Sequence, residues 1–328
     1  MSKHTLAKAL ALLVALTGLP MAALCSSPQT QTSLSTDVPS DFLPEGMAWD
    51  GKHRQFLLGS IRLHRVDVVD PRSGHSRPFA TAPGSVLGLQ ITPDGHELWG
   101  VWTSFGKGFN HNASTGIIAW SLDDGHRLGA WPLADKDPRV NLGDLLMVDA
   151  HSIVTTDSGT GAVYVFDRQR KTYRAIVPAG QFDSPQGIAR GRIPGTVYMA
   201  EYSTGIWRIT LNNGQRQHLV PSDKVLGLDG LYRAGDTLIA VQNGTKIPRI
   251  LSIELGKDDT IDGVAILAAG RKTWSGPTLG AVVGDRFWFN ATGQWDLFDD
   301  ELRPVPKAHL QPVLLDSVVI APAALKQS

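Results

Sequence analysis

A repeated unit of 42 to 57 residues constrains the fold of this 328-residue chain more than any other feature. Each unit opens with a short apolar run, passes through a turn and continues through further apolar runs. The six openings are Glu45-Gly-Met-Ala-Trp49, Leu87-Gly-Leu-Gln90, Asp144-Leu-Leu-Met147, Gln186-Gly-Ile-Ala189, Asp229-Gly-Leu-Tyr232 and Thr278-Leu-Gly-Ala281. Their spacings of 42, 57, 42, 43 and 49 residues match the roughly 40 to 50 residues of a four-stranded propeller blade. The longest spacing contains an insertion between Ser104 and Ser114.

Between these openings the chain has the sequence pattern of an all-β protein. Short β-type runs are separated by strong turn signals such as Thr92-Pro-Asp-Gly95 and Leu211-Asn-Asn-Gly214, and long 3.6-residue periodicity is absent. An array of β-sandwiches would not explain regular spacing over more than two hundred residues. We therefore predict a six-bladed β-propeller of four-stranded blades over residues 42–328. Pro312–Ile320 is expected to complete the sixth blade, and residues 34–45 could help to close the ring, although they show no clear strand pattern.

The N-terminal segment predicts export. Lys3 and Lys8 precede an apolar run, Ala9–Leu19, that is short for a membrane span, so residues 1–25 are interpreted as a signal peptide. The alternative is a retained hydrophobic anchor. Residues 26–41 are rich in Ser, Thr, Gln and Pro and are interpreted as a flexible linker. We expect a periplasmic or secreted protein that has no membrane contact after cleavage.

Charge and cysteine content exclude other classes of protein. Lys and Arg together number 31, as do Asp and Glu, so no basic field is available for nucleic acid. Cys25 is the only cysteine, which rules out a disulfide within the chain; Leu24 is large for the residue that precedes a lipidated cysteine. A monomer that acts on a small molecule is the expectation.

The openings of the repeat predict a metal site. In a propeller the first strand of each blade lines the central channel, so residues at one phase of the repeat converge on the axis. Four of the six positions hold oxygen-bearing residues of the Glu, Asp and Gln type, at Glu45, Asp144, Gln186 and Asp229, and none is Lys, Arg or His. Carboxylates brought together in this way favour a hard divalent cation, Ca²⁺ first and Mg²⁺ or Mn²⁺ next. The alternative is that each side chain only bonds nearby backbone N–H groups.

Several of these stretches resemble the gluconolactonase/regucalcin-like propeller superfamily, to which paraoxonases and strictosidine synthase are related. They are Pro44-Glu-Gly-Met-Ala-Trp-Asp50, Ser184-Pro-Gln-Gly-Ile-Ala189, Tyr198-Met-Ala-Glu-Tyr-Ser203, Leu228-Asp-Gly-Leu-Tyr232, Ala240-Val-Gln-Asn-Gly244 and Pro277-Thr-Leu-Gly-Ala-Val-Val-Gly-Asp285. The resemblance implies one divalent cation at the channel mouth and hydrolysis of a lactone or ester. It implies that Glu45 is a metal ligand and that Asp229 is both a ligand and the general base.

The chain also departs from the pattern of this superfamily. Gln186 stands where better-known members have a ligand Asn, and Gly143-Asp144 stands in place of an Asn-Asp pair. Asp144 is therefore expected to orient the substrate or to complete the coordination shell, and Asn141 lies at a different phase. Gly276 precedes Pro277-Thr278 where the closest relatives have an acidic residue.

Two further assignments stay open at this stage. His111, in the insertion, would approach the ligands only if that segment folded over the channel. Trp295 is expected to pack in the core, with a place at the channel mouth as its alternative, whereas Trp99, Trp102, Trp120, Trp207 and Trp288 are expected to pack between blades. Motifs of serine hydrolases, NTPases, zincins and Rossmann enzymes are absent from the sequence. The rival of a metal-dependent hydrolase is a non-catalytic propeller that binds a small molecule or a protein around a structural cation.

Overall fold

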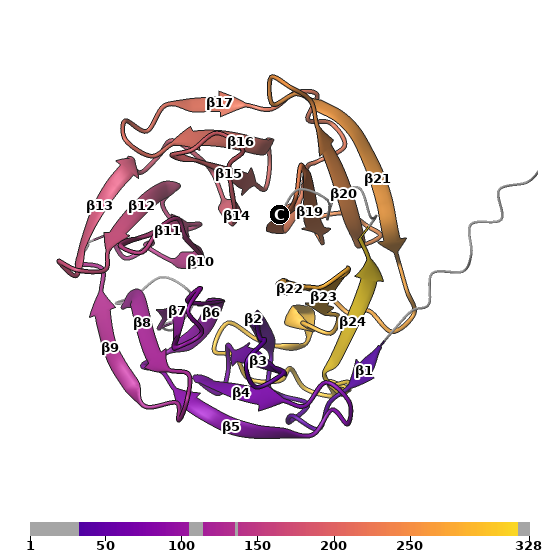
Figure 1. The fold of residues 1–328 in the computed structure, drawn as a ribbon. Coiled ribbons are helices and arrows are strands. Elements are labelled where there is room, and N and C mark those ends of the chain that lie inside the picture. The colour runs from indigo at the N-terminus through magenta and orange to yellow at the C-terminus, as the bar shows by residue number, and fades with distance from the viewer. Residues whose placement is uncertain (1–32, 105–113, 135–136, 321–328) are drawn as a thin grey trace, which may run out of the picture. The chain divides into compact units, whose positions relative to one another are not determined.

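The prediction of a six-bladed β-propeller is confirmed. The computed structural model describes residues 33–104, 114–134 and 137–320, and these form six antiparallel sheets of four strands each around a common axis (Figure 1). The predicted signal peptide, Cys25 and His111 lie outside the described residues. In the described part of the chain, no helix has the length and apolar character needed to cross a membrane.

Five blades are each built from four consecutive strands, ordered from the axis outwards. Blade one contains β2 (Pro44–Asp50), β3 (Gln55–Ser60), β4 (Arg65–Val69) and β5 (Ser76–Thr81). Blade two contains β6 (Ser85–Ile91), β7 (Glu97–Thr103), β8 (Thr115–Ser121) and β9 (Arg127–Pro132). Blade three contains β10 (Leu142–Met147), β11 (Ser152–Asp157), β12 (Ala162–Asp167) and β13 (Thr172–Val177). Blade four contains β14 (Pro185–Arg190), β15 (Thr196–Glu201), β16 (Gly205–Thr210) and β17 (Arg216–His218). Blade five contains β18 (Leu228–Ala234), β19 (Thr237–Gln242), β20 (Arg249–Leu255) and β21 (Ile261–Ala269).

The sixth blade joins the two ends of the propeller. Its inner strands are β22 (Gly280–Val283), β23 (Arg286–Asn290) and β24 (Leu314–Val319), and its outermost strand is β1 (Leu34–Ser35). The register pairs Leu34 with Leu315, and both the amide and the hydroxyl of Thr36 donate to the Val313 carbonyl, at 3.0 and 2.9 Å. Pro312–Ile320 therefore supplies the third strand of this blade and not its last.

The same contacts change the expected start of the propeller. Residues 33–41, which the sequence assigns to a linker, include β1 and the buried side chains of Thr36 and Val38. Residues 34–45 thus help to close the ring, as expected, although two paired residues are too few to give a period-2 pattern. The folded unit begins ahead of residue 42.

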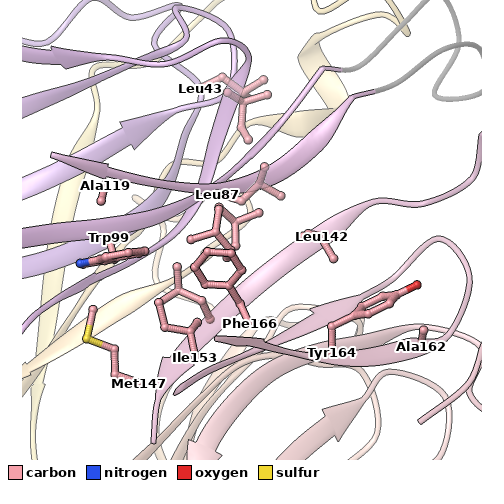
Figure 2. Close-up of a cluster of buried hydrophobic side chains, with 14 of the residues drawn as sticks. Leu43, Leu87, Trp99, Ala119, Leu142, Met147, Ile153, Ala162, Tyr164 and Phe166 are labelled. Carbon is pink, nitrogen blue, oxygen red and sulfur yellow. The ribbon is translucent and has the colours of Figure 1, made fainter. Parts of the chain in front are cut away.

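Packing between neighbouring blades supplies the core. Figure 2 shows one such cluster, in which Leu87 and Trp99 of blade two lie close to Ile153 and Phe166 of blade three. Trp99 also stacks on Trp131, with 5.3 Å between ring centroids. The five tryptophans that were expected to pack between blades all lie in or against such clusters. These interfaces hold the ring together and fix where each inner strand meets the axis.

Replacement of Phe166 tests this reliance on interfaces between blades. The side chain is fully buried, so Phe166→Ala is expected to lower the free energy of unfolding by about 3–5 kcal/mol through lost contacts and the cavity left behind. Urea unfolding followed by tryptophan fluorescence measures the loss. The matched control is Leu128→Ala, at a side chain that is 44% exposed, which should change stability by less than about 0.5 kcal/mol. Equal effects of the two changes would contradict this account of the core.

Candidate functional site

A pocket of about 330 Å³ lies where the inner strands begin at the channel mouth. All four residues selected from the sequence, Glu45, Asp144, Gln186 and Asp229, line it. They come from blades one, three, four and five, so residues far apart in the chain share one small space, as the repeat predicts.

A shared irregularity aims these side chains at the axis. The strands β2, β10, β14 and β18 shift register directly after their first paired residue and β6 after its second, so two residues form a bulge near the start of the inner strand in five blades. The first bulge residue is Glu45 in blade one, Gln186 in blade four and Asp229 in blade five. The second is a glycine in four of these blades, because the neighbouring blade lies against it: a Cβ on Gly46 would be 1.8 Å from the Leu87 carbonyl oxygen.

Blade three breaks this arrangement, which corrects the sequence alignment of the repeats. Here Gly143 is the first bulge residue and Asp144 the second, so Asp144 does not share the phase of Glu45 and Asp229. Its carboxylate accepts hydrogen bonds from the backbone N–H groups of Leu145, at 2.8 Å, and Ile188, at 3.2 Å. Asp144 thus lies one residue deeper, where it lines both the pocket at the mouth and a second cavity of about 260 Å³ further along the channel.

At the level of the inner strands, blades two and six contribute only apolar side chains to the pocket. Leu87 takes the first bulge position in blade two, and Leu279 lines the pocket from blade six. Thr278, which the spacing placed at the channel mouth, is buried instead with its hydroxyl 3.4 Å from the Glu45 carbonyl oxygen. Two sides of the pocket are therefore without a side-chain oxygen from an inner strand.

Glu45 is the most strongly perturbed acid in the pocket. Burial raises the pKa of Glu45 well above its ordinary value, and the negative charges of Asp229 and Asp144 raise it further. A hydrogen bond from the indole Nε1 of Trp295 to its Oε2, at 3.2 Å, opposes these effects. A cation close to this carboxylate would relieve both the desolvation and the repulsion.

Two hydrogen bonds in series link Asp229 to Tyr202 of blade four. Asn243 donates from Nδ2 to Oδ2 of Asp229 at 2.7 Å, and Tyr202 donates its hydroxyl to Oδ1 of Asn243 at 3.1 Å. Burial raises the pKa of Asp229 to about 6, although the bond from Asn243 favours the charged form. Oδ1 of Asp229 makes no hydrogen bond to any described residue. This oxygen remains available to a ligand or a water molecule.

Amide oxygens complete the set of donors. Oδ1 of Asn141 is buried and has no partner among the described residues, and its Nδ2 donates to Ser158 at 3.2 Å. Gln186 donates from Nε2 to Ser184 at 2.7 Å, and its Oε1 makes no hydrogen bond to a described residue. Both Asn141 and Gln186 line the pocket. An orphaned buried oxygen is costly, and a cation or a donor from a ligand would satisfy it.

The donor chemistry fits a hard cation. No Lys, Arg or His occurs among the described residues that line the pocket, whereas three carboxylates do. The described residues hold no group of three or more His, Cys, Asp and Glu side chains arranged as a ready metal cage. The fit therefore rests on a mixed set of carboxylate and amide oxygens, which is the set that Ca²⁺ and Mg²⁺ accept.

Some residues of the pocket were missed or misplaced by sequence reasoning. Asn141 was set aside because it lies two residues before Gly143 and at a different phase of the repeat, but it lines the pocket. Asn243 and Tyr202 received no role, since their place beside Asp229 depends on loops that follow second strands. Trp295 both packs against the core and lines the pocket, so its two alternatives are compatible.

Comparison with known proteins supports the fold and no closer relationship. No protein-family model matches the chain, and no curated protein matches it. Regucalcin from Agrobacterium tumefaciens, titled a calcium-binding protein, superposes with a TM-score of 0.60 at 14% identity over 88% of this chain and 93% of that one. A gluconolactonase from Xanthomonas campestris gives 0.59 at 15% identity over 88% and 89%. Virginiamycin B lyase from Staphylococcus aureus gives 0.59 at 15% identity over 88% and 99%. Proteins of different activities thus share this propeller architecture.

The burial of Asp144 has a consequence for stability. Burial raises the pKa of Asp144 to about 7, so between about pH 4 and pH 7 the folded protein holds a proton that the unfolded chain releases. The free energy of unfolding of the chelator-treated protein should therefore fall as pH rises through this window. Asp144→Asn should reduce the fall by on the order of 1–3 kcal/mol. Urea unfolding at a series of pH values measures it, with the exposed Asp223→Asn as the control. A variant with the wild-type slope would show that Asp144 is ionised in the folded protein.

Proposed function

We propose that this protein is an exported, divalent-metal-dependent hydrolase of the lactonase or esterase type, with its cation at the channel mouth. The observation that carries the proposal is the convergence of Glu45, Asp144 and Asp229 in one pocket whose lining includes no basic side chain. The regucalcin and gluconolactonase neighbours show that this architecture accommodates calcium binding and lactone chemistry in other proteins.

Glu45, Asp229 and the amide oxygen of Gln186 are the residues that would hold the cation. Asn141 offers a further oxygen from blade three. When bound, a divalent cation supplies Lewis-acid polarisation of the substrate carbonyl. Ca²⁺ is the first candidate because the set mixes carboxylates with amides, followed by Mg²⁺ and Mn²⁺.

Other residues of the pocket would supply the general base, orient the substrate and exclude water. A water molecule attacks the carbonyl carbon of the lactone or ester, and Asp229 accepts its proton through the oxygen that Asn243 leaves free. The carbon–oxygen bond to the leaving group then breaks, and the proton passes to the departing alkoxide to give an acid and an alcohol. Asp144 would orient the substrate. The aromatic face of Trp295 and the side chains of Leu87 and Leu279 would exclude bulk water from one side.

A non-catalytic propeller with a structural cation is the alternative. Leu87 and Leu279 provide no side-chain ligand at two of the six blades, and Gly143 provides none at the first bulge position of blade three, which favours binding over turnover. In this case the same pocket would hold the cation, and loss of the metal would change the melting temperature alone.

Metal binding is the first test. Calorimetric titration of the chelator-treated full chain with Ca²⁺, Mg²⁺ and Mn²⁺ should show one site. Glu45→Gln and Asp229→Asn should each weaken binding at least about tenfold, which corresponds to about 1.4 kcal/mol, because each removes a charged ligand. Asp223→Asn, at an exposed loop, is the control. Absence of binding by the unmodified protein would overturn the metal proposal.

Asn243 provides a sharper test of the proposed base. Its hydrogen bond favours the charged form of Asp229, so Asn243→Leu should raise the pKa of Asp229 and move the acidic limb of kcat/KM to higher pH. Asp229→Asn should lower kcat about 10²–10⁴-fold on any lactone or ester that the protein turns over. A pH–rate profile for each variant makes the comparison. Unchanged turnover by Asp229→Asn would assign the base to another residue.

A further inference from the structure

A second pocket, of about 480 Å³, lies at the other end of blades one and six. The strand β2 connects the two ends, because Glu45 stands at its start by the channel mouth and Trp49 near its finish, about 13 Å further along. The turn after β2 and the turn between β4 and β5 form one rim of this pocket. The pocket is larger than the one at the channel mouth and shares no residue with it.

Three aromatic rings make the floor of this aromatic pocket. Trp49, Phe56 and Trp288 come from β2, β3 and β23, and their ring centroids lie 4.9 Å apart for Trp49 and Phe56 and 5.2 Å apart for Phe56 and Trp288. Phe56 and Trp288 are almost completely buried, whereas Trp49 is half-buried. The rings are held by packing from two blades, so Trp49 offers a preformed apolar surface for a flat group.

Hydrogen-bond donors outnumber free acceptors around this floor. The indole Nε1 atoms of Trp49 and Trp288 donate to no described residue, and neither Arg54 nor Arg72 has an ion-pair partner among the residues that the structure describes. The one carboxylate of the lining, Asp70, already accepts hydrogen bonds from Ser73 and from the backbone N–H of Arg72. Two exposed guanidinium groups at the rim therefore favour an anionic group.

Arg54 occupies a backbone conformation that favours glycine. Its φ of 56° is left-handed, and turns of similar form between other strands of the propeller have Gly74 and Gly125 in this conformation. An L side chain there costs on the order of 1 kcal/mol. Replacement of Arg54 by glycine would thus remove the guanidinium while relieving the backbone.

We propose that the aromatic pocket binds a small planar aromatic anion, such as an aromatic carboxylate. The ring system lies against Trp49, which Phe56 and Trp288 support from beneath, and the carboxylate accepts hydrogen bonds from Arg54 and Arg72. The volume of about 480 Å³ falls within the range of small-molecule sites. This site is separate from the proposed metal centre and does not depend on it.

The test compares 2-naphthoate with its neutral counterpart, 2-naphthamide, by calorimetric titration of the full chain. We expect one site for 2-naphthoate with at least about tenfold higher affinity than for the amide. Arg54→Gly and Arg72→Gln should each weaken 2-naphthoate binding about tenfold, and binding of the amide should not change. The control is Arg127→Gln, at an exposed arginine of blade two.

Three outcomes of these titrations would overturn the proposal. They are no binding of 2-naphthoate at millimolar concentration, equal affinity for the acid and the amide, and an undiminished affinity in the Arg54→Gly, Arg72→Gln double variant. Thermal unfolding provides the check on folding, since Arg54→Gly should be at least as stable as the unmodified protein. Loss of 2-naphthoate binding in Glu45→Gln would move the ligand to the channel mouth and also contradict the proposal.

Discussion

The close approach of the inner strands at the propeller axis is the constraint on which the candidate site depends. At the second bulge position of blades one and four the neighbouring backbone leaves no room for a side chain, as the contacts of Gly46 and Gly187 demonstrate. The side chain of the residue before each glycine therefore extends into the channel. Three blades use this position for an oxygen-bearing side chain, and their convergence follows from backbone packing and not from attraction between the side chains themselves.

Such a convergence stores electrostatic free energy. Glu45 and Asp229 share a small volume with Asp144, and each is shifted towards its neutral form by burial. The propeller tolerates this because its stability comes from the interfaces between blades, which are extensive and run outwards from the inner strands. The channel mouth is thereby a place where unfavourable charge density can be kept ready for a ligand.

The sequence predicted the number of blades, their strand composition and the residues on three walls of the pocket, because the repeat itself reports which positions share a phase. The sequence analysis placed residues wrongly where the backbone geometry departs from the repeat. Asp144 was aligned with Asp229, although the bulge in blade three places it one residue later. Thr278 faces a neighbouring backbone, and β1 is too short to give a pattern. Asn243, Tyr202 and Trp295 approach the acids from loops, whose course depends on tertiary packing that no local pattern encodes.

The closing contact between β1 and β24 also sets an order of events during synthesis. Thr36 and Val313 are 277 residues apart, so the first strand to emerge from the ribosome has its partner only when nearly the whole chain has been made. Until then β1 has no partner and the edge of β23 stays open, whereas blades one to five can each form from adjacent segments. The ring can therefore close only after the last blade has been translated. A chain truncated before Val313 would keep an unpaired strand edge.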